Sequence, residues 1–378
     1  MTQTVAIVGT GTPSSANGYA MAYRHAEGYR RLDSCSLIAC ADIREENARA
    51  FAETFDIDPA LVYTDHRELL EDVAPDLVSV CTPPRTHADI VVDCAVSGAV
   101  TAVHCEKPMA ATWDACRRMA SVCDREDVQL TINHQRRFAA PYRNAKEIVE
   151  EGRIGELERL EVGGKDLFDY GTHLFDLCGY VTDQTPIDWV LAAVDTRAPR
   201  VVYETYHERQ ALAHWQYSSG VSGLASTGEE GFVPCELRLV GDDGTIEIGH
   251  RDGPPLRLRR NGGDWRRLET GRDGVWRSQP YPVDAVLDRL PFGEGTGLSE
   301  PTYVERAIEE VVECARTGGT STLDARNALQ TTELIFACYE SARRNERVSL
   351  PLEIRGHPIN DLVSESGLEP AQSAASRD

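Results

Sequence analysis

The sequence predicts an α/β protein of two domains: a doubly wound parallel sheet, then an α+β domain with a large, open-faced, mainly antiparallel sheet. Three observations support this. The length of 378 residues is enough for two domains. In the first third, short apolar runs alternate with amphipathic segments, and beyond residue 134 consecutive strand patterns are joined by short turns. We expect residues 1–133 and 134–351 to form the two domains and residues 364–378 a disordered tail.

The first domain is predicted from continuous apolar runs, which are typical of parallel strands buried on both faces. The expected strands are Thr4–Val8, Leu37–Ala41, Val62–Tyr63, Leu77–Cys81, Val100–Cys105 and Val128–Ile132. The expected helices between them are Tyr19–Tyr29, Glu45–Thr54, His66–Glu71, Ala88–Ser97 and Thr112–Asp124.

The second domain is predicted to open with a helix at Tyr142–Glu151, ended by Gly152. Its expected strands are Leu157–Val162, Trp189–Val194, Ala211–Tyr217, Val221–Ser226, Glu236–Val240 and Thr245–Ile248. The segment Arg251–Gly297 is rich in Gly, Pro and charge, and we expect it to be irregular. Two helices follow, one capped by Ser299 with Pro301 in its first turn and one at Leu323–Arg344, and then a short strand at Arg347–Leu350.

The composition is acidic, with a formal net charge of −22, and only three of the 39 basic residues are lysines. Nucleic acid and anionic membranes require clustered positive charge, so neither is an expected partner. Two explanations of the acidic, arginine-rich surface stay open: a high-salt cytoplasm, or a base-composition bias together with a solvated face.

The eleven cysteines include no C-x-x-C pair, which argues against a zinc knuckle or a disulfide framework and favours a reducing compartment. Met1 leads almost directly into the first strand, without room for a signal peptide, and no stretch resembles a membrane span. We therefore expect a cytoplasmic protein.

A glycine loop, Gly9-Thr10-Gly11, follows the first expected strand. Glycines at this place let the backbone approach a pyrophosphate, which then rests on the amides of the following helix. The loop departs from the usual fingerprint, because Ser14 stands where a third small residue is expected and the next glycine is Gly18. The extended segment from Thr12 onward either supplies hydroxyls to phosphate, from Ser14 and its neighbour, or is a surface insertion.

Asp42 ends the second expected strand. A carboxylate there accepts hydrogen bonds from both ribose hydroxyls of NAD and repels a 2′-phosphate. The alternatives for Asp42 are a solvated strand end or a helix N-cap. Arg44 could instead pair with a 2′-phosphate, so NAD is the expected cofactor and NADP stays open.

Two further segments lie at carboxyl ends of expected parallel strands, where open α/β sheets bind ligands. They are Cys81-Thr82-Pro83-Pro84-Arg85-Thr86-His87 and Glu106-Lys107-Pro108. Arg would serve any purely electrostatic task in this chain, so a retained Lys107 indicates an ammonium that exchanges a proton. Spacing alone leaves a functional and a merely structural Lys107 equally open.

The segment Asp169-Tyr170-Gly171-Thr172-His173-Leu174-Phe175-Asp176 has helical spacing, which puts Asp169, His173 and Asp176 on one face. Gly171 in the first turn would let a substrate or nicotinamide ring come close. A carboxylate one turn from an imidazole can hold a hydroxyl and orient the group that takes its proton. A metal site and a buried, hydrogen-bonded histidine are the alternatives, but there is no further compact ligand cluster, so no metal is expected.

Taken together, these motifs resemble the glucose–fructose oxidoreductase/inositol dehydrogenase/MocA (Gfo/Idh/MocA) family over about residues 4–351. The resemblance rests on the order strand–GxG, acidic residue, Thr-Pro-x-x-x-His, Glu-Lys-Pro and Asp-x-Gly-x-His-x-x-Asp. Arg137-Phe138, Tyr339-Glu340-Ser341-Ala342 and Val348-Ser349-Leu350-Pro351 also match. It implies a Rossmann domain, an open-faced sheet domain that mediates a homo-oligomer (a dimer or tetramer), and hydride transfer between nicotinamide and a carbinol carbon of a sugar or cyclitol.

The resemblance also implies roles for single residues. Lys107 matches the catalytic lysine, His173 the general acid/base, and Asp169 the carboxylate that positions substrate, with Arg137 and Tyr170 as further substrate contacts. The expected cofactor contacts are Gly9, Gly11, Thr12, Ser14, Asp42, Ile43, Arg44, Thr82, Pro83, His87, Glu106, Lys107 and Gln135. Only residues 163–168 separate the strand Leu157–Val162 from Asp169, whereas many members have a longer segment there, so the usual substrate residues do not transfer.

Three functions remain open on the sequence. The first is an NAD(P)-dependent dehydrogenase acting on a secondary alcohol or ketone of a sugar, cyclitol or polyol. The second is an NAD-dependent glycosidase that oxidises transiently and eliminates. The third is a non-catalytic NAD-binding regulatory protein, against which the set Lys107, Asp169 and His173 counts.

Overall fold

The chain forms two units that interleave along the sequence in the computed structural model, which describes residues 2–12, 20–197, 200–202, 205–271, 273–275 and 300–366. Unit 1 comprises residues 1–110, 115–138 and 276–326. Unit 2 comprises residues 111–114, 139–275 and 327–378. The helix α9 (Tyr303–Thr317) thus belongs to unit 1, although it follows most of unit 2 along the chain.

Unit 1 contains a six-stranded sheet in which every pair of neighbours is parallel, as predicted. The strands in spatial order are β3 (Val62–Tyr63), β2 (Cys35–Ala41), β1 (Gln3–Val8), β4 (Leu77–Val80), β5 (Ala102–Cys105) and β6 (Gln129–Ile132). The chain order reverses at β1, whose neighbours are β2 and β4. That reversal is the place where doubly wound sheets bind ligands, beyond the carboxyl ends of the strands.

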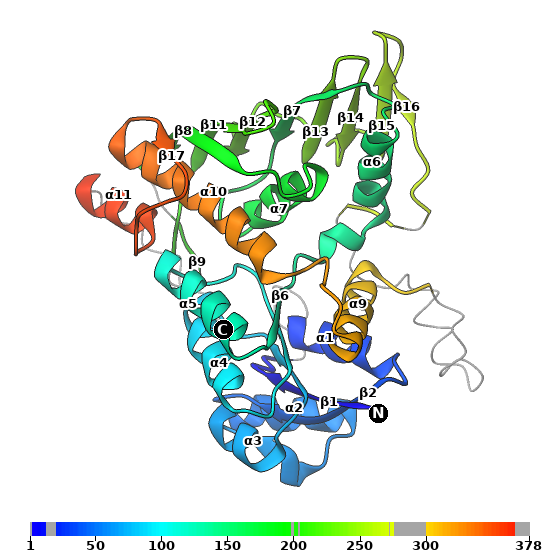
Figure 1. Ribbon diagram of the computed structural model, residues 1–378, viewed down its shortest axis with the longest axis vertical. Coiled ribbons are helices and arrows are strands. Elements are labelled where there is room, and N and C mark those ends of the chain that lie inside the picture. Colours follow the sequence, from blue (N-terminus) through cyan, green and yellow to red (C-terminus); the bar gives the residue numbers. More distant parts are fainter. Residues whose placement is uncertain are drawn as a thin grey trace. The chain divides into compact units, whose positions relative to one another are not determined.

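The α-helices of unit 1 lie where they were expected, although α4 begins four residues before Ala88, and the two 3₁₀ turns were not predicted (Figure 1). They are α1 (Met21–Arg30), α2 (Glu45–Phe55), the 3₁₀ turn η1 (Pro59–Leu61), α3 (His66–Val73), α4 (Pro84–Val96), α5 (Trp113–Arg125) and the 3₁₀ turn η2 (Gln135–Phe138). The helix α9 contributes Ile308 and Val311 to the same core as Tyr23 and Phe51. Its cap is Thr302, which forms a capping box with Glu305, so the prediction of Ser299 as the cap was wrong.

Unit 2 contains a nine-stranded sheet that is antiparallel except at the pair β7–β12, in agreement with the predicted class. Its strands in spatial order are β16 (Arg266–Arg267), β15 (Leu256–Arg260), β14 (Gly244–Ile248), β13 (Leu237–Gly241), β7 (Leu157–Val162), β12 (Ser222–Gly228), β11 (Gln210–Tyr217), β8 (Ile187–Asp195) and β17 (Val348–Ser349). A separate hairpin pairs β9 (Arg200–Val202) with β10 (Thr205–His207). The strands β15 and β16 correct the expectation that the whole segment from Arg251 is irregular; residues 276–297 lie outside the described part.

Helices α6 (Ala140–Glu150), α7 (Gly171–Val181) and α10 (Ala325–Arg344) accompany this sheet (Figure 1). Phe175 of α7 packs against Trp215 of β11, with ring centroids 5.3 Å apart, so one face of the sheet carries the core. On the other face Leu191 and Leu212 are 48% and 43% exposed. The helix α11 (Pro358–Ser366) includes the first residues of the expected tail, and residues 367–378 lie outside the described part.

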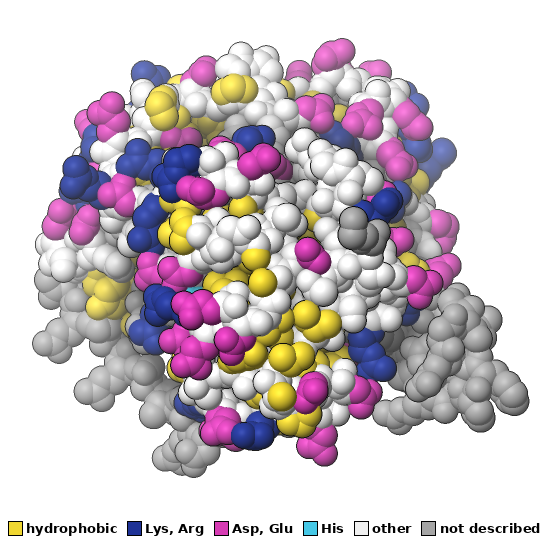
Figure 2. All heavy atoms as spheres, turned by 60° about the horizontal axis from the view of Figure 1, so that its bottom comes forward, with side chains coloured by type: hydrophobic (Ala, Val, Ile, Leu, Met, Phe, Trp, Pro, Cys, Tyr) yellow, Lys and Arg dark blue, Asp and Glu magenta, His cyan; other side chains and the backbone are white. Residues whose placement is uncertain are grey.

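Acidic and basic side chains are interspersed on the face drawn in Figure 2, which agrees with a solvated, mixed surface. No helix among the described residues is long and apolar enough to cross a membrane. All eleven cysteines are free, and nine of them are buried.

Candidate active site

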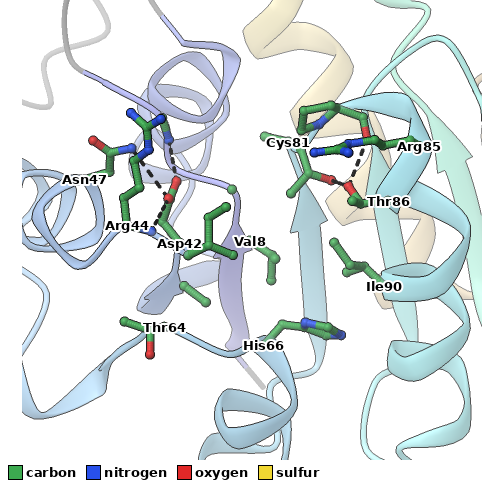
Figure 3. Close-up of a pocket in the computed structure, with 16 residues that line it drawn as sticks. Val8, Asp42, Arg44, Asn47, Thr64, His66, Cys81, Arg85, Thr86 and Ile90 are labelled. Atoms are coloured by element: carbon green, nitrogen blue, oxygen red, sulfur yellow. Dashed lines mark hydrogen bonds between the residues drawn. The ribbon is translucent and has the colours of Figure 1, made fainter. Parts of the chain in front are cut away.

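A cavity of about 270 Å³ lies at the carboxyl ends of β1, β2 and β4, where the strand order reverses (Figure 3). Its lining includes four residues that the sequence assigned to the cofactor: Gly9, Gly11, Asp42 and Thr82. Ile43, Arg44 and Pro83, which were assigned likewise, also line it. The parallel topology therefore brings together segments that are up to about 70 residues apart in the sequence.

Gly9 and Gly11 have positive φ angles of 86° and 62°. A Cβ atom on Gly9 would lie 2.5 Å from Thr82 Cγ2 and 2.9 Å from the Thr82 amide nitrogen, so only glycine fits between β1 and β4. Thr12 is exposed beside them. Ser14 and Gly18 lie outside the described residues, so the role of the extended loop stays a prediction.

The Asp42 carboxylate is buried and faces the glycine loop. Its Oδ2 atom accepts hydrogen bonds from the Gly11 amide (2.9 Å) and from Thr10 Oγ1 (3.2 Å), and its Oδ1 atom accepts one from the Arg44 amide (2.9 Å). The N-cap of α2 is Arg44, so Asp42 is neither that cap nor a solvated strand end. A carboxylate has about four acceptor positions, and Asn47 Nδ2 occupies the fourth only weakly, 3.5 Å from Oδ1, so a ribose hydroxyl can take that position.

Side chains on the rim of the cavity differ in how firmly they are held. Ile43 is 90% exposed and offers an apolar surface beside Asp42. The His66 ring is held by Asp93, whose Oδ2 atom lies 2.9 Å from His66 Nε2. Figure 3 shows Asp42 and Arg44 on one side of the cavity, with Cys81 and Arg85 on the other.

His87 is completely buried, and both of its ring nitrogens contact backbone carbonyls. Nε2 lies 2.6 Å from the Thr82 carbonyl oxygen, and Nδ1 lies 3.1 Å from that of Pro108. Burial lowers the pKa of His87, although these carbonyls oppose the shift. His87 was assigned to the cofactor, but in the structure it joins the Thr82 turn to the Lys107–Pro108 turn.

Glu106 and Lys107 follow β5. The Glu106 side chain is buried and hydrogen-bonded, whereas Lys107 is half-buried. Gln135 and Arg137 lie in η2, after β6, and both are buried. Arg137 donates a hydrogen bond from Nη1 to the Thr322 carbonyl (2.8 Å), a structural contact that its assignment to substrate did not anticipate.

In unit 2, a turn before α7 holds Asp169 and Tyr170. Asp166 Oδ1 accepts hydrogen bonds from the amides of Asp169 (2.9 Å) and Tyr170 (2.8 Å). The helix begins only at Gly171, so Asp169 lies before it, and the prediction that Asp169 shares a helical face with His173 and Asp176 was wrong. The Asp166 carboxylate thus satisfies two amides that precede the helix and have no acceptor within it.

Gly171 is required for a different reason from the predicted one. A Cβ atom there would lie 2.4 Å from the Asp166 carbonyl oxygen, so the residue permits this close backbone contact. His173 and Asp176, in the first two turns of α7, are buried. The Tyr170 hydroxyl donates to Glu236, which also accepts a hydrogen bond from Tyr142.

Family models match both parts of the chain. The model "Oxidoreductase family, NAD-binding Rossmann fold" matches residues 3–134, and "Oxidoreductase family, C-terminal alpha/beta domain" matches residues 158–350. The chain belongs to the Gfo/Idh/MocA oxidoreductase family. Its first domain is thus an NAD-binding Rossmann domain, and the chain is an oxidoreductase of this family.

Individual proteins that are similar to this Gfo/Idh/MocA chain include named dehydrogenases. The myo-inositol 2-dehydrogenase of Thermotoga maritima is 33% identical over 230 residues, which cover 57% of this chain and 67% of the relative. The D-apiose dehydrogenase of Paraburkholderia graminis is 24% identical over 86% of each chain. An inositol dehydrogenase homologue from Azotobacter vinelandii, solved with NADH and myo-inositol, shares the fold with a TM-score of 0.72 at 20% identity, over 92% of this chain and 98% of that one.

Three residues that support the site in unit 1, His25, Ser79 and Asn133, were not predicted from the sequence. They form a buried network with Glu106. A signal was present for one of them, since His25 falls among Ala22, Ala26 and Tyr29 on the apolar face of the predicted first helix. A buried polar side chain requires a partner, but the sequence did not indicate which one. No cluster of three or more metal-ligating side chains occurs among the described residues.

Proposed function

We propose that this chain is an NAD-dependent dehydrogenase that interconverts a secondary alcohol and a ketone on a sugar, cyclitol or related polyol. The observation that carries the proposal is the Asp42 carboxylate, which lines the cavity at the strand-order reversal of an NAD-binding Rossmann domain. The named dehydrogenase relatives support this substrate class.

The residues around the cavity suit a dinucleotide. Gly9 and Gly11 leave the backbone uncovered where a pyrophosphate approaches, and Asp42 offers acceptor positions to ribose hydroxyls. The negative charge of Asp42 disfavours the 2′-phosphate of NADP, while Arg44 beside it would favour that phosphate. We therefore propose NAD as the preferred cofactor. When bound, its nicotinamide accepts or supplies the hydride.

Lys107, His173 and Asp169 are proposed to act on the substrate. The Lys107 ammonium binds the reacting oxygen and stabilises the charge that develops there during oxidation. The His173 imidazole accepts the hydroxyl proton as the general base and returns it in the reverse direction. Asp169, whose amide is fixed by Asp166, accepts a hydrogen bond from a substrate hydroxyl and orients it, with Tyr170 beside it.

The proposal is tested by incubating the purified protein with NAD⁺ or NADP⁺ and a panel of polyols, cyclitols, sugars and glycosides. Both the absorbance of reduced nicotinamide and glycoside cleavage are followed. We expect reduced cofactor to accumulate with a free polyol and NAD⁺, and Lys107→Met to abolish this while leaving NAD⁺ binding within a few-fold. Cleavage of a glycoside without net reduction would instead support the glycosidase, and cofactor binding without either reaction would support a regulatory role.

We further propose that the exposed face of the nine-stranded sheet joins copies of this chain into a homo-oligomer. Leu191 and Leu212, on the neighbouring strands β8 and β11, supply exposed apolar surface there. The free cysteines support a reducing, cytoplasmic location. Light scattering on the wild type and on the double variant Leu191→Glu/Leu212→Glu tests the assembly, which we expect the variant to lose.

A further inference from the structure

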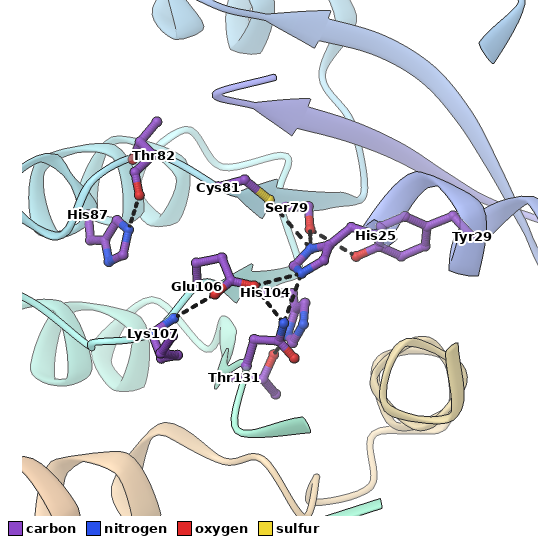
Figure 4. A network of polar contacts seen from close by, with 11 residues as sticks. His25, Tyr29, Ser79, Cys81, Thr82, His87, His104, Glu106, Lys107 and Thr131 are labelled. Carbon is purple, nitrogen blue, oxygen red and sulfur yellow. Dashed lines mark hydrogen bonds and ion pairs between the residues drawn. The ribbon is translucent and has the colours of Figure 1, made fainter. Parts of the chain in front are cut away.

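A buried polar network lies at the carboxyl ends of β4 and β5, centred on His25 of α1 (Figure 4). The His25 side chain is completely buried. Its Nε2 atom lies 3.0 Å from Glu106 Oε1, and its Nδ1 atom lies 2.7 Å from Ser79 Oγ. The ring therefore connects the end of β5 with β4.

Both oxygens of the Glu106 carboxylate are engaged. Asn133 Nδ2 donates a hydrogen bond to Oε1 at 2.6 Å, next to the one from His25. Asn133 Nδ2 also lies 2.9 Å from His25 Nε2. Oε2 accepts a hydrogen bond from the Lys107 backbone amide at 3.2 Å. The position of the carboxylate thus fixes the backbone of the residue proposed to bind the reacting oxygen.

The other edge of the His25 ring faces the cofactor cavity. Cys81, which lines that cavity, has its Sγ atom 3.5 Å from His25 Nδ1. Ser79 Oγ also accepts a hydrogen bond from the Tyr29 hydroxyl at 3.2 Å. Cys81 therefore connects His25 to the cavity, and Glu106 connects it to the Lys107 backbone.

The pKa values of His25 and Glu106 depend on each other. Burial by itself would lower the pKa of His25, but the neighbouring Cys81 and Glu106 raise it above its usual range. Burial would likewise raise the pKa of Glu106, but His25, Asn133 and Lys107 lower it to about 2. The ring centroid of a further titratable residue, His104, lies 5.0 Å from that of His25. Burial lowers the pKa of His104 to about 3, so its ring stays neutral. Tyr29 also stays neutral, because burial raises its pKa.

We propose that His25 is a positioning residue of the cofactor site, which holds Glu106 and, through it, the Lys107 backbone, and which cancels the charge of that carboxylate. The proposal rests on the proposed function and on the expected contact of Glu106 with the bound cofactor. The oxidised nicotinamide ring is positive and the reduced ring is neutral. An uncompensated carboxylate beside it would favour the oxidised cofactor, and His25 removes this bias.

The test compares the dissociation constants of NAD⁺ and NADH, measured by titration calorimetry on the full chain between about pH 6 and about pH 9. The variants are His25→Gln, Glu106→Gln and the double variant. His104→Gln is the matched control, because His104 is equally buried in the same network and its Nδ1 bonds Thr131 rather than a carboxylate.

In the wild type, the ratio of the NADH to the NAD⁺ dissociation constant should not change with pH. In His25→Gln we expect the ratio to exceed the wild-type ratio on the order of tenfold, because the Glu106 charge then lacks its counter-charge. The double variant should return the ratio to the wild-type value, and His104→Gln should leave it unchanged. A ratio in His25→Gln equal to that of the wild type would overturn the proposal, because a purely structural residue weakens both forms equally.

Nitrogen NMR of the wild-type histidines gives a second readout that does not depend on a variant folding. We expect both ring nitrogens of His25 to carry protons at neutral pH, and a neutral His25 ring would overturn the proposal. Failure of the proposed function would look different: neither cofactor form would bind the wild type, while the spectrum would still report the ion pair.

Discussion

Two buried glutamates, one in each unit, support the candidate site residues, and their pKa values are shifted in opposite directions. Glu106 of unit 1 pairs with the His25 ring, and its pKa is lowered. Glu208 of unit 2 accepts hydrogen bonds from the Leu167 amide (2.6 Å) and the Tyr339 hydroxyl (2.7 Å). Burial and the nearby Asp166 charge raise the pKa of Glu208. Equal burial thus gives opposite shifts, because only Glu106 has a partner that can carry a positive charge.

The difference corresponds to what each carboxylate supports. Glu106 lies next to Lys107. Because His25 balances the Glu106 charge, the electrostatic field at Lys107 stays constant. Glu208 anchors the start of the turn that leads to Asp169, and there Asp166 already supplies the negative charge, opposite Arg200 Nη2 at 3.3 Å. A full charge on Glu208 would lie close to the Asp166 charge, which together with burial raises the Glu208 pKa.

The largest expected effect comes from breaking the ion pair. Glu106→Gln leaves the buried His25 without its counter-charge, and we expect a loss of about 3 kcal/mol in the free energy of unfolding, measured by urea denaturation. The stability that comes with the raised pKa of His25 is complete below about pH 6.5. The stability that comes with the lowered pKa of Glu106 is complete above about pH 4.5. The difference in the free energy of unfolding between the wild type and the variant should therefore be largest between these pH values, and it should shrink as the pH rises towards the His25 pKa of about 10. A small gap that is constant with pH would contradict the pairing.

Removing the anchor of the turn in unit 2 should cost less. Asp166→Ala leaves the amides of Asp169 and Tyr170 without their acceptor, and we expect a loss of about 2 kcal/mol together with a fall in kcat. Dissociation constants for NAD⁺ should stay unchanged. The control is Asp195→Ala, which removes a surface ion pair with Arg197 and should cost less than about 1 kcal/mol. Equal effects of the two substitutions would show that the turn does not depend on Asp166.

Cofactor choice should respond more moderately. Asp42→Asn removes the charge that repels a 2′-phosphate but keeps an acceptor oxygen for the glycine loop. We expect the preference for NAD⁺ over NADP⁺ to fall roughly tenfold, as measured by the ratio of dissociation constants. Arg44→Ala provides the opposite test, since it should reduce NADP⁺ binding alone. An unchanged ratio in Asp42→Asn would mean that Asp42 serves only the glycine loop.

The smallest effect is expected at Glu208. Glu208→Gln resembles the protonated side chain, so its free energy of unfolding should differ from the wild type by less than about 1 kcal/mol below about pH 4.5. A raised pKa means that the folded wild type binds the extra proton and loses stability as the pH rises above that value. The variant should therefore become relatively more stable towards neutral pH. A variant that loses stability instead would show that Glu208 is charged in the fold.

Local patterns were enough to predict the strands of unit 1, Asp42 and the Glu106–Lys107 pair, because each depends on neighbouring residues and on the edge that parallel strands share. They were not enough for His25, whose partner Glu106 is 81 residues away. The start of α7 was misplaced because the spacing of Asp169, His173 and Asp176 does not indicate the residue at which helical backbone bonding begins. The core position of Ile308 in unit 1 likewise depends on packing between distant segments, which periodicity does not specify.

Isotope transfer decides whether this chain moves hydride between a carbinol carbon and a nicotinamide cofactor. A panel polyol that gives activity is deuterated at its carbinol carbons and supplied with NAD⁺, and the reduced cofactor is analysed by mass spectrometry. We expect one deuterium on the nicotinamide for each substrate oxidised, and none with Lys107→Met. Oxidised product formed alongside an unlabelled cofactor would rule out this transfer.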